Sequence, residues 1–213
     1  MAGIGMYGVY YAKCVKNEGV TIGYSGGVKM LGKAISANFT PNNPEDNPLY
    51  ANNGVAENDS SSASGGTLNM TLDRLKQDAA ADLYGLVVEE VTANVGGTEV
   101  TGQALKYRGN EQSAPVGVAF VRMHQQDGMR KHEVVLYRSV TFGMPNEAAQ
   151  TMGESIEWQT PEISGTVQGL EGDGSEPWFE SVVFPSQEAA LEYIYDRFKE
   201  QPTENRAAGK VGV

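Results

Sequence analysis

The stretch VGVAFVRMHQQDGMRKHEVVLYRSV, residues 116–140, decides the fold. Two runs rich in valine, aromatic and other apolar residues flank the dipeptide Asp127-Gly128. This dipeptide suits the positive φ angles of a two-residue type I′ turn, which joins antiparallel strands. The stretch therefore predicts a β-hairpin with its turn at Asp127 and Gly128.

Both faces of this predicted hairpin are apolar away from the turn, because successive strand residues point to opposite sides. On one face the expected cross-strand pairs are Arg122–Glu133, Phe120–Val135 and Val118–Tyr137. On the other face they are Val121–Val134 and Ala119–Leu136. We therefore expect cover on two sides, by the protein's own core and by a helix or another subunit.

Similar short runs of β-branched and aromatic residues, separated by Gly, Asn and Pro, extend to both ends of the chain. The candidate strands are residues 6–16, 20–31, 33–40, 67–70, 86–95, 99–107, 115–125, 130–142, 154–167 and 178–184. Many short strands with regular turn signals are typical of an all-β sandwich or barrel. The sequence thus predicts a mainly β protein with a two-sheet β-sandwich or barrel.

Two segments have helical rather than alternating spacing. In the first, Thr71 can cap a helix over about 71–84 that Gly85 ends, and in the second, Ser186 can cap a helix over about 187–200 that Pro202 stops. The apolar stripes are Leu72, Leu75, Ala79 and Leu83 in the first helix, and Leu191, Ile194, Tyr195 and Phe198 in the second. We expect both helices to pack on sheets.

The segment PNNPEDNPLYANNGVAENDSSSASGG, residues 41–66, is far longer than an ordinary connection of about 4–6 residues. Connections of that length are usually functional or disordered, and we expect a long inter-strand loop here. Its apolar centre, Leu49 and Tyr50, should dock on a surface. No composition shift marks a second domain, so residues 1–200 are expected to form one domain and residues 201–213 a flexible tail.

Composition excludes several classes of function. Lys and Arg number 16 against 27 Asp and Glu, a net charge of −11, which argues against binding nucleic acid through phosphate contacts. Cys14 is the single cysteine, so an intrachain disulfide and a cysteine metal site are excluded. The chain contains no apolar run approaching the ~18 residues of a membrane helix. We expect a soluble protein that folds in a reducing cytoplasm.

The residue types that carry catalysis form no convincing constellation. His124 and His132 fall on opposite faces of the predicted hairpin, and Glu89 and Glu90 on opposite faces of their strand, so neither pair can share a metal or substrate. We expect no catalytic, cofactor-binding or metal-binding residues, and no enzyme activity. Trp158 shares strand parity with Ile156, which favours a place in the core or in a subunit interface.

Several stretches together resemble one protein family. They are GKAISAN (32–38), NPLYANN (47–53) with Glu57, a Gly-Gly-Thr-Leu strand followed by a short helix, PVGV (115–118), the Asp127-Gly128 hairpin and GESIEWQTPEISGT (153–166). This combination resembles the major tail proteins of phages of Gram-positive bacteria with long, non-contractile tails. The resemblance spans roughly residues 5 to 200.

The resemblance implies a tail tube subunit with a two-sheet β-sandwich and a flanking helix. Subunits of this family form hexameric rings that stack into a tube, through which the genome leaves the capsid. The implied partners are other copies of the chain, the tape measure, tail terminator and distal tail proteins, and DNA that passes without specific binding. The implied location is the virion tail, after assembly in the host cytoplasm, with no membrane contact.

By the same resemblance, loop 41–66 would contact the neighbouring ring. The expected stacking residues are Asn47, Pro48, Leu49, Tyr50 and Glu57. An acidic channel would repel phosphates and let DNA pass without sticking. The candidate channel carboxylates are Glu89, Glu90, Glu99, Glu154 and Glu157.

Two alternatives stay open. In the first, the protein is also a tube subunit, but of the inner tube of a contractile tail, a tail-like bacteriocin or a secretion system. The other is a monomeric β-sandwich module that binds a ligand such as a carbohydrate, with Trp158 or Trp178 as a stacking platform.

Overall fold

The computed structural model describes residues 2–16, 22–43, 47–59, 64–126, 128–145, 149–151, 158–169 and 177–199. Within them the chain is mainly β, as predicted, with twelve strands and two helices. The strands are β1 (Ala2–Lys16), β2 (Ile22–Gly32), β3 (Ala34–Pro41), β4 (Asn47–Ala51), β5 (Gly54–Asp59), β6 (Gly66–Leu72), β7 (Val87–Val95), β8 (Thr98–Lys106), β9 (Val116–Gln126), β10 (Met129–Phe142), β11 (Glu162–Val167) and β12 (Phe179–Phe184). The helices are α1 (Gln77–Tyr84) and α2 (Gln187–Lys199).

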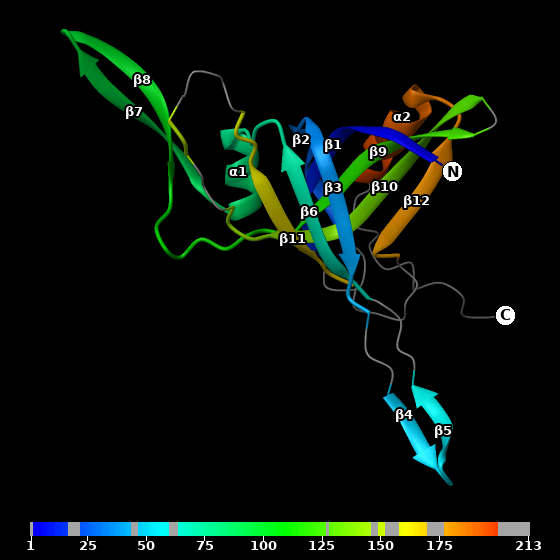
Figure 1. Cartoon of the computed structure of the whole chain (residues 1–213). Helices are drawn as coiled ribbons and strands as arrows, with labels where there is room; N and C mark the ends of the chain where they lie inside the picture. The colour runs from blue at the N-terminus through cyan, green and yellow to red at the C-terminus, as the bar shows by residue number, and fades with distance from the viewer. Residues whose placement is uncertain are drawn as a thin grey trace, which may run out of the picture.

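Eight strands form a single antiparallel sheet in the order β2-β1-β9-β10-β11-β6-β3, with β12 also paired to β10 (Figure 1). The two sheets expected from the sequence are therefore joined into one. The joint is the long strand β10, whose residues 132–137 pair with β12 and whose residues 140–142 pair with β11. The sheet curls, so that β3 comes close to β1 and one face encloses the main core.

The β9–β10 hairpin has the predicted register: Met129 pairs with Gln126, and every cross-strand pair expected between residues 118 and 137 is present. The prediction that it is covered on both faces is also confirmed. Phe120, Val135 and Tyr137 face the main core, which includes residues of α1. Val121 and Val134 face a second cluster, formed with Ile194 and other residues of α2.

Helix α1 is shorter than predicted, and Thr71 does not cap it. Thr71 belongs to β6, where it pairs with β3 and β11, and this sheet pairing continues to Leu72. The Asp73 carboxylate then accepts hydrogen bonds from the backbone N–H groups of Lys33 and Arg74, which holds the chain in a turn before the helix. The predicted end is correct: Gly85 has a φ of 68° and its N–H caps the carbonyl of Ala81.

Helix α2 begins as predicted. The Oγ atom of Ser186 accepts a hydrogen bond from the N–H of Ala189, 3.2 Å away. Ala190, Ile194 and Phe198 are buried against the outer face of the sheet. The predicted tail, residues 201–213, lies outside the described residues.

Two hairpins project from the body in Figure 1, and one of them corrects a prediction. The segment 41–66, expected to be a loop, contains strands β4 and β5, which form a two-stranded sheet of their own. Asn52 and Asn53 have positive φ angles of 51° and 64°, as a tight hairpin turn requires. The second projecting hairpin is β7–β8, also a separate two-stranded sheet.

Candidate interaction surfaces

The β4–β5 hairpin carries all the predicted stacking residues. Asn47, Pro48, Leu49 and Tyr50 belong to β4, and Glu57 belongs to β5, where it pairs with Leu49. The stem of the segment is well defined, since Pro41 pairs with Gly66 and the Asn42 N–H donates to the Gly65 carbonyl over 2.9 Å. The side chains of these five residues lie outside the described part, so the docking of Leu49 and Tyr50 stays a prediction.

The β7–β8 hairpin is two-faced. It turns at Gly96 and Gly97, with φ angles of 61° and 88°. Strand alternation and the observed register put its outer residues on two sides. Beyond the base, one side carries Val91, Ala93, Val95, Thr98 and Val100, and the other carries Glu90, Thr92, Asn94, Glu99, Thr101 and Gln103. All of them are exposed.

Three of the predicted channel carboxylates lie on this hairpin. Glu90 and Glu99 are exposed on its polar side. Glu89 accepts a hydrogen bond from Lys106 over 2.5 Å and forms a second ion pair with Arg108. The hydrogen bond from Lys106 and the two positive charges hold the pKa of Glu89 below its usual value. Glu89 is therefore neutralised by its neighbours. Glu154 and Glu157 lie outside the described residues.

The outer face of β3, β6 and β11 is polar but almost uncharged. It alternates with the core-facing residues of the same strands, and carries Ser36, Asn38, Thr40, Thr67, Asn69, Thr71, Glu162, Ser164 and Thr166. Glu162 is the only ionisable side chain in that set. A shallow pocket opens on this face beside Met144 and Pro145. The sequence analysis missed this surface, although its signal, hydroxyl and amide residues at every second position, is visible in all three strands.

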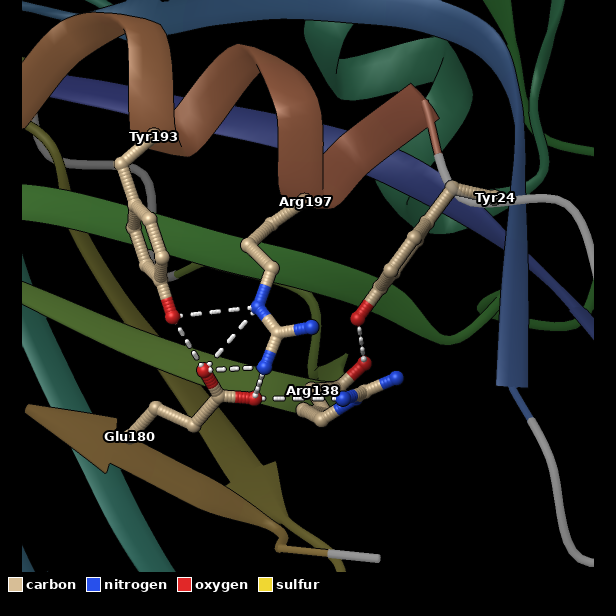
Figure 2. A network of polar contacts seen from close by, with 5 residues as sticks. All are labelled: Tyr24, Arg138, Glu180, Tyr193 and Arg197. Carbon is tan, nitrogen blue, oxygen red and sulfur yellow. Dashed lines mark hydrogen bonds and ion pairs between the residues drawn. The ribbon is translucent and has the colours of Figure 1, made fainter.

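A buried ionic network ties α2 to the sheet (Figure 2). The Glu180 carboxylate on β12 accepts hydrogen bonds from Arg138 at 3.1 Å, from Tyr193 at 2.8 Å, and from Arg197 at 2.7 and 2.8 Å. Burial opposes ionisation of Glu180, but these donors and the two guanidinium charges outweigh it and lower its pKa. A carboxylate enclosed by donors in this way is a structural clamp between helix and sheet.

The two histidines lie on opposite faces of the β9–β10 hairpin, as the register predicts. His124 contacts the Glu133 carboxylate, which also binds Arg122 and Ser181. His132 instead lies 3.0 Å from the hydroxyl of Tyr7. Within the residues that the structure describes, no group of three or more His, Cys, Asp or Glu side chains could hold a metal ion.

The two tryptophans have different environments. Trp158 is 87% exposed and precedes β11, so the expected place in the core is wrong and a place in a subunit interface stays a prediction. The predicted strand 154–167 is shorter than expected, and its first residues lie outside the described part. Trp178 packs against Phe39 and Phe179, with ring centroids 5.8 Å apart in both contacts.

No protein-family model matches the sequence, and none of the curated proteins compared with it matches. Over the described residues, the structure has no helix with the length and apolar character needed to cross a membrane.

Proposed function

We propose that this protein is a tail tube subunit of a phage, which assembles with other copies into rings, and that the rings stack into a tube. The observation that carries the proposal is the β4–β5 hairpin. It leaves the body at a fixed stem, Pro41 and Gly66, and among the described strands it pairs only within itself. A hairpin held away from its own body is suited to contact a second molecule.

The rest of the surface supports self-assembly. The outer strands β2 and β3 end the sheet, and exposed strand edges invite pairing with another chain unless they are covered. A ring of identical subunits covers such edges, and a head-to-tail contact along the axis repeats indefinitely. The hexamer comes from the family resemblance alone.

The outer face of β3, β6 and β11 suits the wall of a channel for DNA. Its hydroxyl and amide groups hold water and carry no positive charge, so passing phosphates meet no strong attraction. The chain's net charge of −11 adds a repulsive field. The acidic channel expected from the sequence thus becomes, in this proposal, a polar wall with Glu162 as the one ionisable residue of its set, in a negatively charged tube.

The test is electron microscopy of the purified protein over a concentration series, with light scattering on the same samples to give mass. The matched variant replaces residues 43–64 by Asn-Gly, because the backbone pairing of Asn42 and Gly65 leaves a stem that a two-residue turn can close. We expect tubes from the unchanged chain, and rings that fail to stack from the variant.

Two other outcomes would count against the proposal. Tubes formed by the variant would overturn the stacking role of the hairpin. A chain that stays monomeric at every concentration, and also after addition of tail initiator proteins, would overturn the tail tube itself. A gene for a sheath protein beside the gene of this protein would instead indicate the inner tube of a contractile tail, a tail-like bacteriocin or a secretion system.

One observation favours a second candidate, a monomeric module that binds a ligand by stacking. Trp158 exposes 87% of its surface, which is unusual for so large an aromatic side chain. This candidate predicts a monomer whose tryptophan fluorescence responds to glycans, and whose response disappears in Trp158→Ala. The tube proposal predicts no such response.

A further inference from the structure

We propose that the β7–β8 hairpin of one copy lies along strand β12 of the next copy, with its valine side continuing the apolar side of β12. The inference rests on the proposed self-assembly and identifies the surfaces that make the contact within a ring. Both partners are surfaces of this chain, and neither has a role in the proposed stacking by β4–β5.

The hairpin offers the first surface. Val95 is 65% exposed and Val100 is 52% exposed, on the same side of a ribbon whose other side is polar. An isolated two-stranded hairpin is marginally stable in water, so a ribbon of nine-residue strands with an uncovered apolar side gains stability when that side is buried. The one-sided pattern indicates a contact on that side.

Strand β12 offers the second surface. Among the described strands it pairs only with β10, so its other edge presents backbone N–H and C=O groups without a strand partner. Phe179 and Val183 are exposed and lie on one side of the strand, with Ser181 between them. An edge strand with one apolar side is the surface that an added strand recognises, through backbone hydrogen bonds and alternate side chains.

Charge also favours the pairing of these two surfaces. Glu90 and Glu99 make the outer part of the hairpin acidic. The third carboxylate, Glu89, lies near the base and is neutralised there by Lys106 and Arg108. The strand β12 lies beside the tip of the β9–β10 hairpin, which carries Arg130 and Lys131. Opposite charges within about one Debye length, ~8 Å in physiological salt, attract and orient the two molecules.

The positions of the two surfaces set the symmetry of the contact. The β7–β8 hairpin and the β9–β10 tip lie at opposite ends of the molecule in Figure 1, so one chain cannot join them to each other. A contact between different surfaces on two copies is head-to-tail, and it generates a closed ring when the rotation between copies closes. The contact is therefore of the kind that a ring requires.

The first test compares two lysine substitutions at neighbouring positions on β8. Val100→Lys puts a charge on the valine side, and Thr101→Lys puts the same charge on the polar side of the same exposed ribbon. We expect Val100→Lys to raise the protein concentration needed for ring formation by roughly tenfold or more, and Thr101→Lys to leave it within about twofold. Equal effects of the two variants would overturn the inference.

The second test is cross-linking in a Cys14→Ser background, which removes the native thiol. One chain carries Val100→Cys, another carries Val183→Cys, and a short bismaleimide joins thiols that lie close together. We expect a cross-linked dimer from the mixture and none from either chain alone. A dimer from Val100→Cys alone would show a symmetric contact and overturn the head-to-tail arrangement.

The two tests separate this inference from the proposed function. Rings or tubes without a cross-link between positions 100 and 183 would overturn the inference but not the proposed tail tube function. The cross-link in a chain that forms no ring or tube would support the contact and overturn the tube. Absence of both would overturn both.

Discussion

Arg197 on α2 donates three hydrogen bonds to Glu180 on β12: Nη2 lies 2.8 Å from Oε1 and 2.7 Å from Oε2, and Nε lies 3.1 Å from Oε2. The same carboxylate contacts Arg138 on β10, whose side chain is 5% exposed. One carboxylate therefore contacts two guanidinium groups, and it joins the C-terminal helix to two strands of the sheet.

Replacing this carboxylate should lower the free energy of unfolding. Glu180→Gln keeps the shape of the side chain but removes the negative charge that faces the buried Arg138 guanidinium. Breaking a buried pair from one side typically costs 3–5 kcal/mol, so we expect the free energy of unfolding to fall by about 3 kcal/mol in urea titrations.

The matched control is the ion pair between Lys199 and Asp196 on the same helix. Lys199 Nζ lies 3.2 Å from Asp196 Oδ1, and both side chains are exposed. Asp196→Asn should change the free energy of unfolding by less than about 0.5 kcal/mol, because solvent screens such pairs. Equal effects of the two variants would show that the Glu180 network does not hold the helix to the sheet.

Stability should fall in acid. Burial opposes ionisation of Asp82, Glu133 and Glu180, yet hydrogen bonds and neighbouring positive charges lower the pKa of each below its ordinary value of 3.8 or 4.5. A carboxyl whose pKa is lower in the folded state stabilises the fold above its unfolded pKa. That contribution is lost as the pH falls through the folded pKa.

We therefore expect the urea midpoint to hold steady from pH 7 to about pH 5 and to fall below about pH 4.5. Glu180→Gln should flatten part of that fall, because it removes one of the three groups. An unchanged slope in this variant would mean that Glu180 ionises alike in the folded and unfolded chain.

Local sequence patterns predicted the register of β9–β10 correctly, because the Asp127-Gly128 turn and the alternation of residues 118–137 specify the same pairing. The mistake at Thr71 has a physical cause. Leu72 fits the apolar stripe of a helix, and it does face the core, but it reaches the core from the end of a strand. The spacing of apolar residues alone does not show whether Leu72 reaches the core from a helix or from the end of a strand.

Other features depend on distant contacts that no local pattern contains. The pairing of β12 with β10 joins strands about forty residues apart in the chain, and the neutralisation of Glu89 needs Arg108 from beyond the next strand. The β4–β5 hairpin could have been predicted from the sequence, since two consecutive asparagines before Gly54 suit a tight turn. The polar composition of the segment favoured a loop instead.

Gly85 should tolerate no side chain. It has a φ of 68°, and a Cβ atom there would collide with the backbone carbonyl oxygen of Gln112. Gly109 has a φ of 87° and open space around a Cβ atom, so Gly109→Ala measures the backbone cost alone. We expect a loss of roughly 1 kcal/mol in the free energy of unfolding for Gly109→Ala, and at least about 2 kcal/mol for Gly85→Ala. Equal losses would contradict the collision with Gln112.

The two tryptophans should separate stability from assembly. Trp178 packs against Phe39 and Phe179 at the edge of the core, so Trp178→Ala should lower the free energy of unfolding by about 2–3 kcal/mol. Trp158 is exposed, so Trp158→Ala should change it by less than about 0.5 kcal/mol.

If Trp158 lies in a subunit interface, as the sequence predicts, Trp158→Ala should still weaken assembly. In Trp178→Phe, which leaves Trp158 as the only tryptophan, acrylamide should quench the fluorescence of the monomer strongly and that of the assembled protein weakly. Strong quenching in both states would exclude Trp158 from the interface, because a tryptophan buried between subunits is shielded from the quencher.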